Sequence, residues 1–218
     1  DGGVNNFTGN GSDVIYVREV TVTQVTSDGF VTTWYDQSGS SNAVQATPAN
    51  QPKIVENGAV LVDSAGKPEI DFDGTSHKLD IDFGSNLSQP NSIFMVHQSD
   101  ELLEADNEFF DRTVESGQRT LFDVTTDGTE RRYRILAQSS LHTTNAQITT
   151  PISKNLIVGV YDGTGSSLSL NGNATNFTDT VGADSINSSS TIGFSIGTGN
   201  YYDGTMQEFI IYNSNQSE

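Results

Sequence analysis

The feature that most constrains the fold is a long series of short β-type runs, each separated from the next by a turn signal. Hairpin-forming pairs occur at Asp28-Gly29, Asn57-Gly58, Asp73-Gly74, Asp127-Gly128, Asp162-Gly163 and Asn171-Gly172. Such pairs readily adopt the positive φ angles of tight hairpin turns. The runs between them are rich in β-branched and aromatic residues and do not alternate with helical segments. This pattern predicts an all-β, antiparallel β-sandwich.

Strands are expected wherever a β-type run lies between two turn signals. The runs lie near residues 14–25, 30–36, 52–56, 59–62, 68–73, 77–83, 92–98, 119–125, 129–137, 145–149, 154–161, 166–171, 190–196 and 204–212. Residues 100–112 are predicted to form a helix or a long acidic loop. Residues 1–13 are rich in Gly and Asn and are interpreted as a linker or lead-in. Residues 14–218 are expected to form one sandwich domain, a common length for such a fold.

Alternation of apolar and polar residues assigns several runs to faces. In residues 68–73, Ile70 and Phe72 are expected to face the core. The run 155–161 is apolar on both faces, which is typical of a central strand. In the last run, four residues are expected to share a face: Met206, Glu208, Ile210 and Tyr212. Glu208 is then a charge on a largely apolar face.

Composition excludes several classes of function. The formal net charge is −18, with 28 acidic and 10 basic residues. Nucleic acids and anionic membrane surfaces need clustered Lys and Arg, so neither is an expected partner. The chain has no Cys, which excludes disulfides and thiolate metal sites. No apolar run reaches transmembrane length, so membrane insertion is not expected.

Three segments resemble known proteins. The run Val31-Thr32-Thr33-Trp34-Tyr35-Asp36-Gln37-Ser38-Gly39, followed by Asn42 and Gln51-Pro52, resembles a segment of the arabinofuranosidase B catalytic domain. It equally resembles concanavalin A-like, laminin-G-like domains of bacterial and phage surface proteins. Phe72-Asp73-Gly74 and the last run, 204–213, resemble a turn and the final strand of laminin-G-like domains. The resemblance implies a jelly-roll sandwich on a cell surface or virion, with carbohydrate as the ligand.

The resemblance leaves three functions open. The first is an extracellular, non-catalytic lectin-like or adhesin module that binds a glycan or cell-surface polysaccharide. The second is a spacer or decoration domain that associates with copies of itself in a larger assembly. The third is a glycoside hydrolase, with Glu208 at the position of the arabinofuranosidase B nucleophile. That family's acid lies beyond the end of this sequence, and its disulfides are absent here.

Aromatic faces and hydrogen-bonding side chains are the residue types that bind sugars. The candidate ligand-binding residues are Gln37, Asn42, Arg132, Tyr133, Arg134, Tyr201 and Tyr202. The adjacent tyrosines are expected in a loop, where packing does not explain them. The arginines could bind an acidic glycan or could neutralise neighbouring acidic strands. Trp34 is interpreted as either core or platform, and His97 as a hydrogen-bonded core or rim histidine.

Calcium is the cofactor that this composition allows, because it prefers oxygen ligands from loops. The candidate ligands are Asp36, Asp71 and Asp73. Asp36 ends a run beside Gln37, Ser38 and Asn42, which all carry side-chain oxygens. Asp71, Asp80 and Asp82 lie on the outward faces of runs that could be adjacent. The alternative is an acidic face that is simply solvated.

Overall fold

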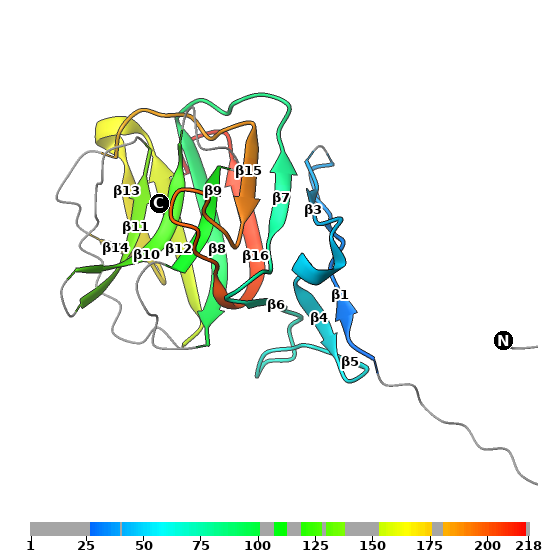
Figure 1. The fold of residues 1–218 in the computed structure, drawn as a ribbon. Helices are drawn as coiled ribbons and strands as arrows, with labels where there is room; N and C mark the ends of the chain where they lie inside the picture. The colour runs from blue at the N-terminus through cyan, green and yellow to red at the C-terminus, as the bar shows by residue number, and fades with distance from the viewer. Residues whose placement is uncertain are drawn as a thin grey trace, which may run out of the picture.

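The computed structural model describes residues 27–39, 41–100, 107–112, 119–127, 130–137, 153–175 and 181–216. These residues form two antiparallel sheets stacked face to face (Figure 1). Two short 3-10 turns, η1 (Pro48–Asn50) and η2 (Gly163–Gly165), interrupt the connections. Within these ranges, no helix is long and apolar enough to cross a membrane. The predicted all-β, antiparallel sandwich is confirmed.

The first sheet has nine strands and the second has seven. In spatial order the first sheet contains β1 (Gly29–Phe30), β4 (Lys53–Glu56), β6 (Ile70–Asp73), β16 (Asp203–Tyr212), β8 (Asn91–Ser99), β12 (Asn155–Tyr161), β13 (Ser167–Leu170) and β14 (Asn173–Thr175), with β5 (Ala59–Val60) paired to β4. The second contains β11 (Glu130–Leu136), β10 (Leu121–Asp127), β9 (Asn107–Arg112), β15 (Ser189–Ile192), β7 (Leu79–Asp82), β3 (Ala43–Val44) and β2 (Thr33–Trp34).

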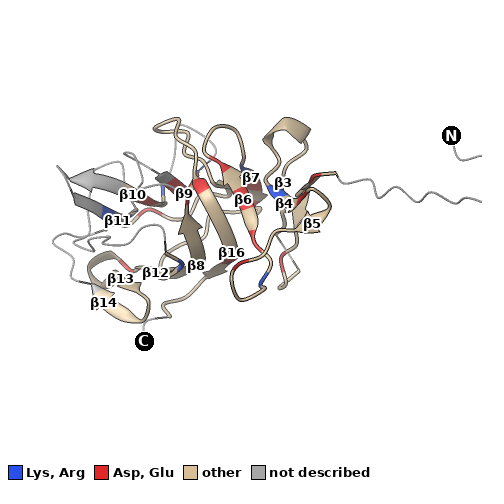
Figure 2. Ribbon diagram, turned by 90° about the horizontal axis from the view of Figure 1, so that it is seen from below, with Lys and Arg blue, Asp and Glu red and all other residues tan. Residues whose placement is uncertain are grey.

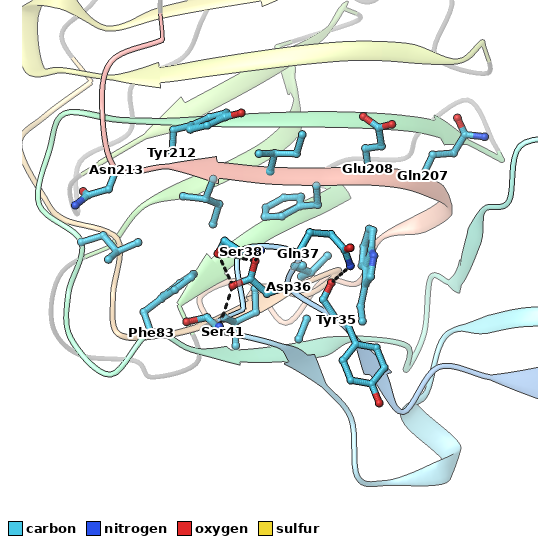
Figure 3. Close-up of a pocket in the computed structure, with 18 residues that line it drawn as sticks. Tyr35, Asp36, Gln37, Ser38, Ser41, Phe83, Gln207, Glu208, Tyr212 and Asn213 are labelled. Atoms are coloured by element: carbon cyan, nitrogen blue, oxygen red, sulfur yellow. Dashed lines mark hydrogen bonds between the residues drawn. The ribbon is translucent and has the colours of Figure 1, made fainter.

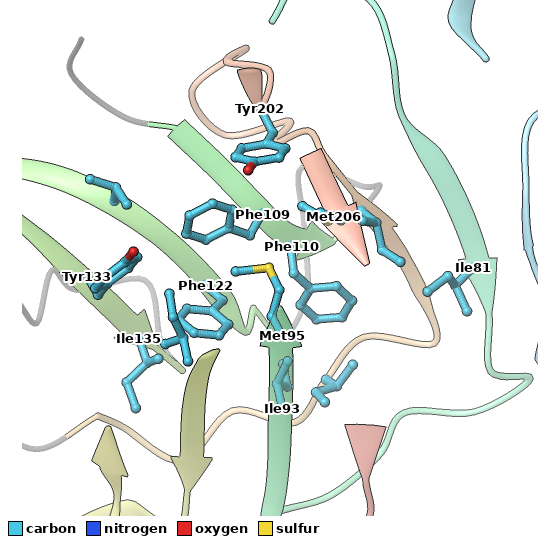
Figure 4. Packing of buried hydrophobic residues seen from close by; sticks show 14 of the residues in the cluster. Ile81, Ile93, Met95, Phe109, Phe110, Phe122, Tyr133, Ile135, Tyr202 and Met206 are labelled. Carbon is cyan, nitrogen blue, oxygen red and sulfur yellow. The ribbon is translucent and has the colours of Figure 1, made fainter. Parts of the chain in front are cut away.

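The core lies between the inner faces of the two sheets (Figure 4). His97 on β8 is buried in this core, where its ring nitrogens lie 3.1 Å from the Tyr202 hydroxyl and 2.9 Å from the Tyr133 hydroxyl. Burial lowers the pKa of His97 to about 3, so the ring is neutral. The interpretation of His97 as a hydrogen-bonded core residue is confirmed. Both tyrosines are fully buried beside it.

Most of the expected strands are present, and one assignment is wrong. Residues 107–112 form strand β9 rather than part of a helix or acidic loop. A β-bulge in its pairing with β10 lets the adjacent Phe109 and Phe110 both enter the core. Adjacent apolar residues hide the alternation that marks a strand. The short strands β3 and β14 were not expected. The predicted strands at 14–25 and 145–149 lie outside the described residues.

A second bulge corrects the predicted face of Glu208. On β16, Met206 is opposite His97 of β8, whereas Glu208 is opposite the next residue, Val96. Gln207 is therefore an extra residue that reverses the alternation. Met206 is fully buried, whereas Glu208 is exposed on the outer face. The expectation that these two residues share a face is wrong.

The acidic outward faces of β6 and β7 are present but not adjacent. Asp71 lies on β6 in the first sheet, while Asp80 and Asp82 lie on β7 in the second. Figure 2 shows acidic residues on strands of both sheets. Dividing these carboxylates between the sheets limits their mutual repulsion.

Candidate ligand cleft

A cleft of about 800 Å³ opens between the sheets beside the C-terminal half of β16 (Figure 3). Eighteen residues line it: Trp34, Tyr35, Asp36, Gln37, Ser38, Ser41, Ala43, Ile81, Phe83, Leu87, Ile192, Gln207, Glu208, Phe209, Ile210, Ile211, Tyr212 and Asn213. They come from four parts of the sequence that the fold brings together. The cleft suits a ligand, because it is concave and mostly apolar with a few polar groups.

The interior of the cleft is an incompletely covered part of the core. Ala43, Ile81 and Ile192 on the second sheet are buried beneath it. A further set of lining residues packs on the core but is only partly buried: Trp34, Phe83, Leu87, Phe209 and Ile211. Trp34 is thus neither a fully buried core residue nor an isolated surface platform. These side chains give the cleft aromatic and aliphatic surface that a ligand could cover.

The loop between β2 and β3 forms a hydrogen-bonded wall. Both carboxylate oxygens of Asp36 accept hydrogen bonds, from the Ser38 N–H at 2.8 Å and the Ser41 N–H at 3.0 Å. The Asp36 N–H donates to the Asn42 side-chain oxygen at 3.0 Å. Gly39 has a φ angle of +92°, which L-residues rarely adopt. The Asp-Gln-Ser-Gly segment therefore builds a defined turn that holds one side of the cleft.

The opposite wall is the edge of β16. β6 pairs with β16 only from Asp203 to Met206, and beyond the bulge β16 pairs with β8 alone. Figure 3 shows Glu208 and Tyr212 pointing to the other side of the strand from Asp36. Because Glu208 and Tyr212 nevertheless line the cleft, the β16 backbone faces it at these residues, beside the inward-facing side chains of Phe209 and Ile211. In the described part of the chain, no strand covers this edge.

Most of the predicted ligand-binding residues lie outside the cleft. Tyr133 and Tyr202 are fully buried, and Arg134 is buried in an ion pair with Asp123. Arg132 is half-buried on β11, and the Tyr201 ring lies 4.5 Å from that of Phe194. None of these five lines the cleft. Their contact with a ligand stays a prediction.

Two predicted residues do belong to the site. Gln37 lines the cleft, with its amide donating to the Tyr35 carbonyl at 3.0 Å, and Asn42 supports the wall through Asp36. The remaining lining residues had no recognisable signal of their own in the sequence. Phe209 and Ile211 could have been found only by placing the bulge at Gln207.

The lining carboxylates do not form a hydrolytic pair. Asp36 is held by Ser38 and Ser41, and the Glu208 side chain points to the outer face (Figure 3). Glycoside hydrolysis in its usual form needs two carboxyl groups that converge on the scissile bond. Asp36 and Glu208 lie on opposite sides of β16 and do not converge in this way.

The predicted calcium ligands are not brought together. Asp36 lies in the β2–β3 loop, whereas Asp71 and Asp73 lie on β6. Burial raises the pKa of Asp73, but N–H donors from His77, Ser76 and Thr75 outweigh it and hold that pKa well below its ordinary value. Among the described residues, no group of three or more His, Asp or Glu side chains could hold a metal ion.

A buried charged cluster lies on the second sheet, on the face of β9 and β10 opposite the core phenylalanines. Glu108 and Asp123 are opposite each other and fully buried. Thr198 donates to Glu108 at 2.8 Å, and Arg134 pairs with Asp123. Burial, reinforced by the charge of Asp123, raises the pKa of Glu108 to about 9. Glu108 therefore carries a proton at neutral pH, and because it is enclosed it is not a ligand site.

Comparison with known proteins supports the fold. No family model matches the chain, and no curated protein matches it significantly. Trypanosoma rangeli sialidase in complex with 2,3-difluorosialic acid is 14% identical with a TM-score of 0.59, over 90% of this chain. The same sialidase with the inhibitor DANA is 15% identical with a TM-score of 0.58, over 88% of this chain. A heptameric SAP-like pentraxin from Limulus polyphemus is 14% identical over 68% of this chain and 77% of its own, with a TM-score of 0.49.

The likeness defines a class of fold and not an activity. The chain spans 30% of the length of the sialidase chains. At this identity the match shows a concanavalin A-like jelly-roll sandwich alone. The resemblance to the arabinofuranosidase B segment gains no support from these matches.

Proposed function

We propose that this chain is an extracellular, non-catalytic carbohydrate-binding or adhesion module of a bacterial surface protein or phage fibre. The observation that carries the proposal is the cleft between the sheets. It combines aromatic surface from Trp34, Phe83 and Phe209 with the amide of Gln37 and the hydroxyl of Ser38. Aromatic faces and directional hydrogen bonds are the two interactions that sugars use.

The surface location belongs to the same proposal. The resemblance to laminin-G-like surface domains supports it, and so does an acidic composition that suits contact with neutral glycans. The Trypanosoma rangeli sialidase itself is in complex with 2,3-difluorosialic acid. Because this chain covers 30% of that protein, its hydrolytic activity is not carried over.

A glycan array followed by isothermal titration calorimetry tests the proposal. We expect Trp34→Ala to weaken binding by up to about tenfold, because an aromatic contact contributes roughly 0.5–1.5 kcal/mol. Gln37→Ala should weaken it through loss of a hydrogen bond. Val60→Ala is the matched control, since Val60 is 52% exposed and does not line the cleft. Binding that is absent at millimolar glycan, or that survives both cleft variants unchanged, would rule the proposal out.

A second candidate function, self-association as a spacer or decoration domain, is favoured by one surface. On the outer face of the first sheet, Leu156, Ile210 and Tyr212 are 39%, 40% and 45% exposed. Phe94 lies between them, 5.7 Å from the Tyr212 ring. Contiguous exposed apolar residues are typical of interfaces. Sedimentation analysis of the chain and of Ile210→Ser/Tyr212→Ser tests this: a monomer at every concentration would exclude it.

A further inference from the structure

We infer that the cleft takes a neutral, linear glycan that lies along the uncovered edge of β16, and that it discriminates against sialic acid, uronate and sulfated sugars. This inference rests on the proposed glycan-binding function and names its ligand class. Three features of the structure carry it: the charge of the lining, the commitment of nearby basic residues, and the shape of the strand edge.

The lining offers no positive charge. Among its eighteen residues there is no Lys, Arg or His, and its two ionisable acids are Asp36 and Glu208. A carboxylate or sulfate entering an apolar cleft loses hydration, which only a cation or several aligned donors can replace. An acidic sugar would instead meet the carboxylate of Asp36, because the Glu208 side chain points to the outer face. The lining therefore disfavours anionic ligands.

Several basic side chains elsewhere in the described structure are engaged with acids. Carboxylate partners are present for each of five such residues: Lys53, Lys78, Arg119, Arg134 and Lys154. The net charge of −18 adds a long-range repulsion of anions. An uncharged ligand avoids both the local and the long-range penalty.

The uncovered edge of β16 indicates a chain rather than a single sugar. It runs from Gln207 to Tyr212, and at about 3.3 Å per residue this is roughly 20 Å. A strand edge presents N–H donors and C=O acceptors in alternation along its length. Sugar hydroxyls both donate and accept, so a linear oligosaccharide can satisfy both kinds of group at successive residues.

The facing wall favours sugar over a peptide strand. An extended peptide could also pair with the edge of β16. Its second edge would then face Gln37, Ser38 and Ser41, which are side chains of a turn rather than a complementary strand. Hydroxyl and amide groups on that wall can bond to sugar hydroxyls in many orientations. Both walls of the cleft can therefore contact the same glycan.

Titration calorimetry of the full chain at 50 and 500 mM NaCl tests the inference. The neutral probes are cellohexaose, xylohexaose and arabinohexaose with their disaccharides, and the acidic probes are 3′-sialyllactose, hexagalacturonate and a heparin hexasaccharide. We expect at least one neutral hexasaccharide to bind tenfold or more tightly than its disaccharide and than every acidic probe. Its affinity should change less than twofold with salt, because no ion pair forms.

A charge substitution provides the matched control. Gln37→Lys places a cation in the lining, and we expect it to improve binding of hexagalacturonate at least fivefold at 50 mM NaCl. Val60→Lys makes the same change in net charge at an exposed position outside the cleft and should leave hexagalacturonate binding within twofold. Equal gains in both variants would show that net charge alone sets the selectivity.

The outcomes separate the two proposals. Tight binding of an acidic probe, or equal affinity for di- and hexasaccharides, would overturn the ligand class and leave the glycan-binding function standing. Binding of no glycan at all would overturn both. A synthetic peptide of residues 14–25, which the sequence predicts to form a strand, is included as a competing probe. If it binds and no glycan does, the edge is a strand-addition site and both proposals fail.

Discussion

At the scale of single residues, Glu108 is a buried acid whose protonation should govern alkaline stability. Its side chain is enclosed opposite Asp123, which Arg134 holds in an ion pair. A neutral Glu108 can donate its proton to a neighbouring acceptor, whereas an ionised one would place a second negative charge beside Asp123. Loss of that proton therefore destabilises the folded state.

We predict that Glu108→Gln stabilises the protein at alkaline pH. The pKa of Glu108 is raised from 4.5 to about 9, so the folded state holds a proton that the unfolded chain releases. Its contribution is complete below pH 4.5 and is lost as the pH rises towards 9. Gln is neutral and of similar shape, so the variant should exceed the native protein by on the order of 2–4 kcal/mol at pH 8.

Urea unfolding between pH 4.5 and 9 measures this difference. It should be small at pH 4.5 and should grow steadily with pH. Glu208→Gln is the control, because Glu208 is exposed and its replacement should give no such trend. A difference that is constant across the pH range would show that Glu108 is ionised in the folded protein.

At the scale of elements, the bulge at Gln207 determines which side chains of β16 face the cleft. We predict that the protein tolerates deletion of Gln207, because Met206 and Glu208 then pair with His97 and Val96 as consecutive residues of a regular ladder. Phe209 and Ile211 stay on the core side and Glu208 stays on the outer face, so the deletion should cost little more than the loss of the Gln207 side chain. Gln207→Ala keeps the bulge and should cost only about 1 kcal/mol through its bond to Asp63.

Thermal and urea unfolding of the two variants test the assignment. If the deletion unfolded the protein while Gln207→Ala did not, the assignment of Gln207 as the extra residue would be wrong. The same bulge shows what alternation can predict. In regular runs such as 70–73 and 79–82, the alternation of apolar and polar residues correctly predicts which residues are buried. Runs that contain a bulge, such as β9 and β16, give the wrong face or the wrong element, because the position of the extra residue depends on the partner strand.

At the scale of the whole molecule, the sandwich was predictable and the cleft was not. Turn pairs and short β-type runs are local features of the sequence, so the fold class can be predicted from them without knowledge of distant contacts. The cleft depends on β16 lying across from β3 and β7, segments that are far apart in the sequence. The predicted tyrosines failed to meet there because Tyr202 and Tyr133 pack around His97 instead.

The net charge of −18 should determine how the molecule responds to calcium. Asp36 already accepts hydrogen bonds from Ser38 and Ser41, and Asp71 and Asp73 lie on another element. We therefore expect calcium to act by screening the net charge of −18 rather than by occupying a site. The melting temperature should rise equally in calcium chloride, magnesium chloride and sodium chloride at matched ionic strength, and chelator should have no effect.

Differential scanning calorimetry with Asp36→Asn as the control variant measures the response. A specific site would stabilise the folded state by mass action, by roughly 2.7 kcal/mol at a hundredfold excess over the dissociation constant. Such a gain would raise the melting temperature by several degrees beyond that in sodium chloride. If calcium alone produces this rise and Asp36→Asn abolishes it, the β2–β3 loop is a calcium site, and a metal ion then adds a cation to the wall of the cleft.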